Sequence, residues 1–110
     1  LRPGDESDAL YAESLRLLGR TDTARAYLAS LPQEHVGSPP VLAVRALLAR
    51  DRGLTDLASQ LGEAAAPWYP GTALAAHPRT PSAWPATWAA LTRRAEASIA
   101  PGPPGLGQAP

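Results

Sequence analysis

The stretch ALYAESLRLLGRTDTA, residues 9–24, decides the fold because its pattern returns 34 residues later as AVRALLARDRGLTDLA, residues 43–58. Seven of the sixteen aligned positions are identical, against roughly two expected by chance at this Ala- and Leu-rich composition. A period of 34 residues is typical of stacked helix–turn–helix units. The sequence therefore predicts an all-α domain of two antiparallel helical hairpins. The identical pairs are Ala9 and Ala43, Ala12 and Ala46, Arg16 and Arg50, Gly19 and Gly53, Thr21 and Thr55, Asp22 and Asp56, and Ala24 and Ala58.

Apolar spacing predicts helices at about 8–18, 22–31, 40–50 and 56–66, with no strand. We expect the first helix to bury a stripe of Tyr11, Leu15 and Leu18, flanked by Leu10 and Leu17, and the fourth to turn Leu57, Ala58 and Leu61 inward.

Turn residues predict where these helices begin and end. Gly19 and Gly53 can adopt the left-handed conformation that ends a helix. Asp5 or Ser7, Thr21 and Ser38 are typical of helix starts, because their side-chain oxygens can accept hydrogen bonds from the first free N–H groups.

The repeated pattern resembles the tetratricopeptide repeat (TPR) family over about residues 6–66. In that register Ala12 and Ala46 are the small residues of the first helices, and Ala24 and Ala58 those of the second helices. The bulky position of the second helix is Leu28 in one repeat and Gly62 in the other. The resemblance implies a concave, partner-binding surface made by the first helix of each repeat. Its possible partner-binding residues are Ala9, Glu13, Arg16, Ala43, Leu47 and Arg50.

Two readings of that surface stay open. Arg16 and Arg50 occupy matched positions, so their guanidinium groups could bind a carboxylate of a peptide. Alternatively they are ordinary solvated helix arginines, which could pair with Glu13 or Asp51. The lysine and asparagine that bind chaperone tails in this family are replaced by Ala9 and Glu13, which disfavours that partner class.

The repeat ends after residue 66. We expect residues 67–82 to form an irregular connector with a short helical turn at 72–77. Ser82 could then start a last helix over about 83–100. The apolar residues of that helix recur at helical spacing, so we expect a helix that caps the last repeat rather than an aromatic ligand platform. They are Trp84, Trp88, Leu91, Ala95 and Ile99. The residues that could form an aromatic platform are Trp68, Tyr69, Trp84 and Trp88, and we expect them to pack as core instead. Residues 1–7 predict an N-terminal loop, and the Pro- and Gly-rich residues 101–110 a disordered tail.

Composition excludes several functional classes. The chain has 110 residues, a net charge of zero and no Cys, and it also lacks Lys, so it offers no basic surface for nucleic acid and no thiol or lysine chemistry. No apolar run is long enough for membrane insertion, and no signal peptide is evident, so we expect a cytoplasmic protein. His35 and His77 both fall in predicted connectors and lack metal-ligand spacing, and no catalytic motif is present. We therefore expect no cofactor, no metal and no enzymatic activity.

The sequence favours a non-enzymatic protein–protein interaction module that binds a peptide or a partner protein. The chain begins at Leu1 rather than Met, so we expect a fragment or a processed product. Because two repeats bury little and at least three are usually needed, we expect the C-terminal part of a longer repeat array. The alternative is a regulatory or packing appendage of an enzyme whose catalytic domain lies upstream. Further 34-residue repeats upstream would favour the array, and a catalytic motif there would favour the appendage.

Overall fold

The computed structural model describes residues 4–92, and in this range the chain is helical with no strand. The predictions for residues 93–110, including the tail and the contribution of Ile99, lie outside the described residues. The helices are α1 (Asp5–Leu17), α2 (Thr21–Ala29), α3 (Gln33–Val36), α4 (Pro39–Asp51), α5 (Thr55–Ala65), α6 (Ala73–Ala76) and α7 (Trp88–Thr92), with 3-10 turns η1 (Ala66–Trp68) and η2 (Pro81–Ala83).

The turn between α1 and α2 has the same backbone as the turn between α4 and α5. Gly19 has φ 83° and Gly53 has φ 78°, a left-handed conformation that costs glycine little. Both turns close with the same pair of hydrogen bonds, which satisfies carbonyl groups at the end of the preceding helix. In the first turn Arg20 N donates to Leu15 O and Gly19 N to Arg16 O, and the second turn repeats both bonds 34 residues later. The prediction that the two glycines lie in equivalent turns is confirmed.

The helix starts differ from the predicted caps. Thr21 is the first residue of α2 rather than its cap, and α1 begins at Asp5 after Gly4, so the expected N-terminal loop is shorter than 1–7. Ser38 does precede α4, but its side chain makes no capping bond. Pro39 and Pro40 follow it, and proline has no N–H for a serine oxygen to accept.

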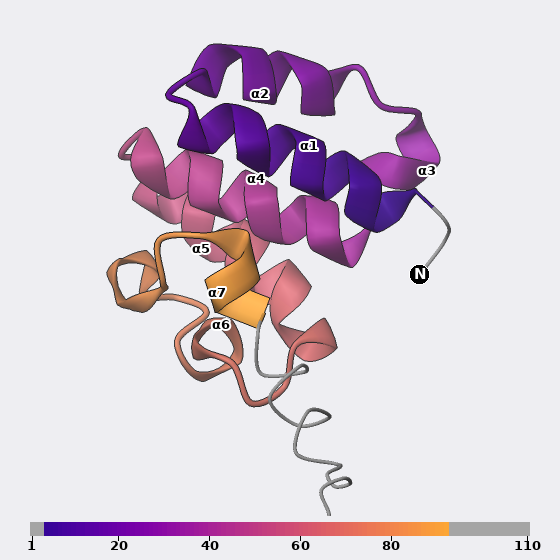
Figure 1. Cartoon of the computed structure of the whole chain (residues 1–110). Coiled ribbons are helices and arrows are strands. Elements are labelled where there is room, and N and C mark those ends of the chain that lie inside the picture. Colours follow the sequence, from indigo (N-terminus) through magenta and orange to yellow (C-terminus); the bar gives the residue numbers. More distant parts are fainter. Residues whose placement is uncertain (1–3, 93–110) are drawn as a thin grey trace, which may run out of the picture.

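The four longer helices form two adjacent layers. α1 packs against both α2 and α4, and α4 packs most extensively against α5 (Figure 1). Alanine pairs that match in the 34-residue register are completely buried, which allows close helix approach. They are Ala9 and Ala43, Ala12 and Ala46, and Ala24 and Ala58.

The buried face of α1 is the opposite of the predicted one. Tyr11 and Leu18 are 54% and 74% exposed, and of the predicted stripe only Leu15 is buried. The helix instead buries its alanines together with Glu13 and Arg16. Hydrophobic spacing identifies an apolar face of a helix but does not say whether the rest of the chain covers that face. The charged side chains of Glu13 and Arg16 can be buried because they pair with each other.

The chain after α5 folds back under α4 and α5 (Figure 1). Its short elements α6 and η2 contact α5, and α7 contacts α4 and α6. The last helix begins at Trp88, not at residue 83, because Trp84 is extended (ψ 147°) before Pro85, and a residue that precedes proline disfavours helical angles. Ser82 lies in η2, and Thr87 is the residue that caps α7, accepting a bond from Ala90 N at 3.1 Å.

Gly62 and Trp84 explain where the second repeat departs from the first. An added Cβ at Gly62 would lie 2.6 Å from the Trp84 ring and 2.8 Å from the Pro78 carbonyl oxygen. Trp84 is buried, and its indole N–H donates to His77 O at 2.7 Å. The first repeat has Leu28 at this position, so the second repeat replaces a large side chain with space for a tryptophan from the C-terminal segment.

Candidate functional site

The six predicted partner-binding residues lie together on the face of α1 and α4, but the chain itself covers this face. Ala9, Ala43 and Leu47 are completely buried, and Glu13 and Arg16 are 4% and 8% exposed. Arg50 is half-buried. The expected concave surface is therefore not open in the described chain.

Residues 84–88 occupy this face and are held through their backbone. Arg50 Nη1 donates to the carbonyl oxygens of Trp84 and Pro85 at 3.1 and 3.2 Å. Arg16 Nη2 donates to Ala86 O at 2.5 Å, and Trp88 N donates to Glu13 Oε2 at 2.7 Å. The matched arginines thus bind peptide carbonyl groups of their own chain, and Glu13 accepts from the first free N–H group of α7.

Charges on this face are balanced. Arg16 Nε lies 2.7 Å from Glu13 Oε1, and Arg16 Nη1 lies 2.5 Å from Asp51 Oδ2. Burial alone lowers the pKa of the Arg16 guanidinium, but the hydrogen bonds and negative charges of Glu13 and Asp51 outweigh it, so the pKa is raised. Arg16 makes the ion pairs with Glu13 and Asp51 that the sequence left open, but the expectation of a solvated arginine is wrong, because the side chain is buried.

The tryptophans of the C-terminal segment belong to the core. Trp84, Trp88 and Leu91 are 5%, 7% and 1% exposed, whereas Trp68 is 62% exposed. Burial also raises the pKa of Tyr69 to about 12. The expectation that these aromatic residues pack as core is confirmed for Trp84 and Trp88 and is wrong for Trp68, which stays exposed.

The outward side of α1 and its C-cap carries several exposed apolar residues. Leu10, Tyr11, Leu17 and Leu18 are each at least half exposed, and their positions fall on one side of the helix. Tyr11 packs edge-on against Tyr27 of α2, with ring centroids 4.6 Å apart. Exposed apolar residues that gather on one face are a feature of interaction surfaces in folded proteins.

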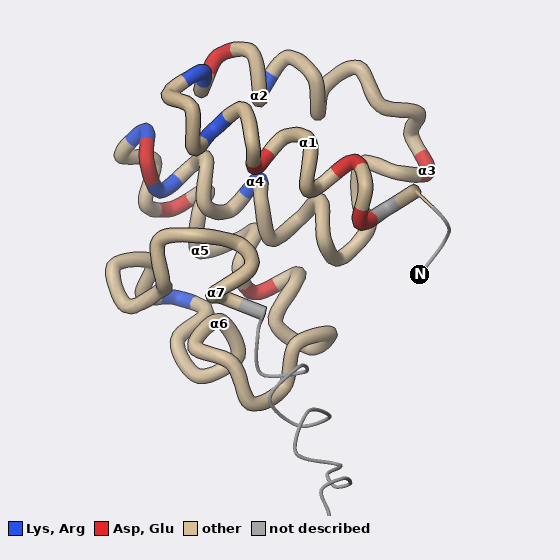
Figure 2. The backbone as a smooth tube through the Cα atoms, viewed as in Figure 1, with Lys and Arg blue, Asp and Glu red and all other residues tan. Residues whose placement is uncertain are grey.

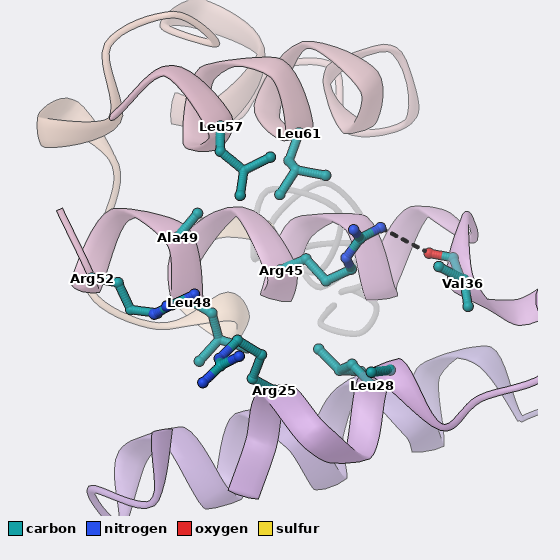
Figure 3. Close-up of a pocket in the computed structure, with 10 residues that line it drawn as sticks. Arg25, Leu28, Val36, Arg45, Leu48, Ala49, Arg52, Leu57 and Leu61 are labelled. Carbon is teal, nitrogen blue, oxygen red and sulfur yellow. Dashed lines mark hydrogen bonds between the residues drawn. The ribbon is translucent and has the colours of Figure 1, made fainter. Parts of the chain in front are cut away.

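A second open surface is the groove between α2, α4 and α5 (Figure 3). Leu57 and Leu61 point into it from α5 and Leu28 from α2, while the helix between them carries Leu48. Leu57 was expected to face inward and is 41% exposed, because the C-terminal segment packs on other parts of α5. The groove has a volume of about 170 Å³, below the roughly 300–1,000 Å³ of small-molecule sites.

Three arginines flank this groove, and no acidic residue lines it. Arg25 comes from α2, Arg45 lies on α4 and Arg52 is the residue that follows α4. Figure 2 shows that arginines gather toward the end of the molecule that carries the two glycine turns. Sequence reasoning missed this groove because its residues come from three helices, and their proximity depends on how the hairpins stack.

His35 and His77 were expected in connectors without a metal site. His35 lies on α3, where its Nδ1 is 3.2 Å from Asp8 Oδ2, while Asp8 Oδ1 accepts from the Tyr27 hydroxyl at 2.8 Å. The pKa of Tyr27 is raised, mainly by burial and to a smaller extent by the hydrogen bond to Asp8. This network links α1, α2 and α3. The described residues contain no cluster of His, Asp and Glu that could hold a metal ion.

Among residues 4–92, no helix has the length and apolar character needed to cross a membrane. Comparison with protein-family models, curated proteins and solved structures finds no match to this chain.

Proposed function

We propose that this chain is a non-enzymatic protein–protein interaction module of two TPR-like helical hairpins. In this proposal it forms the C-terminal part of a repeat array, with α1 and α2 as one repeat and α4 and α5 as the next. The segment 66–92 closes the array, because it covers the face of α4 and α5 that a following repeat would otherwise cover.

A single observation carries this proposal, namely the unequal burial of matched positions on α1 and α4. Val44 and Leu48 of α4 are buried, and both α1 and α2 pack on that helix. Their matched positions on α1 are Leu10 and Ser14, and both are exposed. The first repeat thus presents outward the face that the second repeat buries. A further helical unit that packed on α1 would complete the pattern, since each repeat covers its neighbour.

The experiment compares the wild-type chain with the double variant Leu10→Gln and Leu17→Gln. Both leucines are at least half exposed, so the free energy of unfolding should change by no more than about 0.5 kcal/mol per site. The wild-type chain should associate with rising concentration in sedimentation equilibrium and bind a hydrophobic dye, and the variant should do both less. Leu54→Gln, at an exposed leucine before α5, is the control.

Identical association and dye binding in the wild type and the double variant would contradict the proposal. A double variant that unfolds would also contradict it, because the α1 face would then be part of this chain's own core.

A further inference from the structure

We propose that the groove between α2, α4 and α5 binds a short acidic peptide segment that inserts a large aliphatic side chain between α2 and α5. This inference rests on the proposed function and names the class of partner. It concerns a surface separate from the α1 face, so a failure of this inference can be told apart from a failure of the proposed function.

The shape of the groove favours an aliphatic side chain. Its floor contains Leu48 and Ala49, which are 3% and 4% exposed, and the leucines of α2 and α5 face each other across it (Figure 3). Its volume of about 170 Å³ suits one or two side chains rather than a cofactor. An apolar anchor that fills such a space would gain roughly 25 cal/mol for each Å² of apolar surface buried.

The charges around the groove favour an acidic segment. The side chain of Arg25 is 50% exposed, and its bond to Asp22, at 3.1 Å, is an exposed pair of the kind that contributes little. Arg52 is exposed, and Arg45 Nη1 lies 3.5 Å from Val36 O, at the outer limit of a hydrogen bond. With three guanidinium groups around an apolar floor and no lining carboxylate, the complementary ligand carries carboxylates beside its apolar anchor.

The arginines of the predicted site differ from these in their availability. Arg16 is buried and already bonds two carboxylates and a carbonyl oxygen. The groove arginines keep donors that face solvent, so an acidic ligand can reach them without displacing residues 84–88.

The test uses the whole 110-residue chain and fluorescence anisotropy with short labelled peptides. The first peptide has two leucines flanked by glutamates. In a second peptide lysine replaces the glutamates, in a third glutamine replaces them, and in a fourth serine replaces the leucines. We expect the first peptide to bind most tightly, the glutamine peptide more weakly, and the lysine and serine peptides at least about tenfold more weakly. Binding of the first peptide should weaken as salt is raised.

Arg25→Gln and Arg52→Gln should each lower the affinity for the acidic peptide by about two- to fivefold, as expected for exposed charge pairs. The affinity for the glutamine peptide should stay unchanged. Arg79→Gln is the matched control, because Arg79 is an exposed arginine that pairs with Glu63 outside the groove. Leu57→Ala should weaken both the acidic and the glutamine peptides, since Leu57 forms the apolar wall.

Equal affinity for the acidic and glutamine peptides, or equal losses in Arg25→Gln and Arg79→Gln, would overturn the acidic class of partner. If the serine peptide bound as tightly as the acidic leucine peptide, the aliphatic anchor would be overturned. No binding of the acidic peptide would overturn the whole inference. Self-association that is blocked by Arg52→Gln would identify a second copy as the occupant and also overturn it. In each case the variants keep Leu10 and Leu17, so the association test of the proposed function remains separate.

Discussion

At the scale of single residues, Gly62 shows how one missing side chain fixes the position of the C-terminal segment. Inside a helix, Gly→Ala is ordinarily stabilising by about 0.5–1 kcal/mol. Here we expect Gly62→Ala to destabilise by about 1–3 kcal/mol, because the added Cβ would meet the Trp84 ring and a backbone oxygen of Pro78.

Denaturant unfolding shows whether Gly62→Ala raises or lowers the free energy of unfolding, with Gly37→Ala as the control. Gly37 has a negative φ and no atom near the added Cβ, so its variant should be neutral or slightly stabilised. A Gly62→Ala chain that is more stable than wild type would mean that Trp84 does not pack on Gly62.

Glu13 is the second residue whose environment makes a definite prediction. Its carboxylate accepts from Arg16 and from the backbone of Trp88, and its side chain is 6% exposed. Removal of one member of a buried ion pair leaves the other without compensation, so Glu13→Ala should cost about 3–5 kcal/mol. The control is Glu63→Ala, whose exposed pair with Arg79 should be worth no more than about 1 kcal/mol. Equal losses of unfolding free energy in the two variants would contradict the buried network.

At the scale of elements, the repeated stretch predicted the helices and both turns, because left-handed glycines and apolar spacing are local signals. The sequence could not show that α1 buries Glu13 and Arg16, since their burial depends on Asp51 and on residues 84–88, all distant in the chain. The groove was likewise beyond prediction, because it exists only where three helices stack. The late start of α7 has a local cause, because the residue before Pro85 is extended. The apolar spacing, which predicted a helix from about residue 83, does not take this effect of proline into account.

The C-terminal segment is expected to act as a structural lid. Trp88 is 7% exposed, so Trp88→Ala should cost about 3–5 kcal/mol through the cavity that it leaves. Trp68→Ala removes a tryptophan that is 62% exposed and should change stability by less than about 0.5 kcal/mol. Urea unfolding measures both, and a fluorescence quencher should reach Trp68 but not Trp88. Equal midpoints for the two variants would show that the segment is not part of the core.

At the scale of the whole molecule, the surface has three parts. Residues 84–88 cover part of the α1 and α4 face, the outward face of α1 is exposed, and a groove flanked by arginines lies between α2, α4 and α5. We propose another helical unit for the second part and an acidic peptide for the third. The arginines of the chain therefore fall into two groups, the matched pair on the α1 and α4 face and those beside the groove. Arg16 and Arg50 hold the chain together, whereas Arg25 and Arg52 face solvent.

The most direct test of this division is a map of backbone amide chemical shifts by NMR as the acidic leucine peptide is added. We expect the shifts to concentrate on Leu28, Leu57 and Leu61 around the groove, while the amide of Trp88, which donates to Glu13, stays unchanged. Large shifts at Trp88 and along residues 84–88, with little change at the groove leucines, would contradict the account. The peptide would then displace the chain's own segment from the α1 and α4 face.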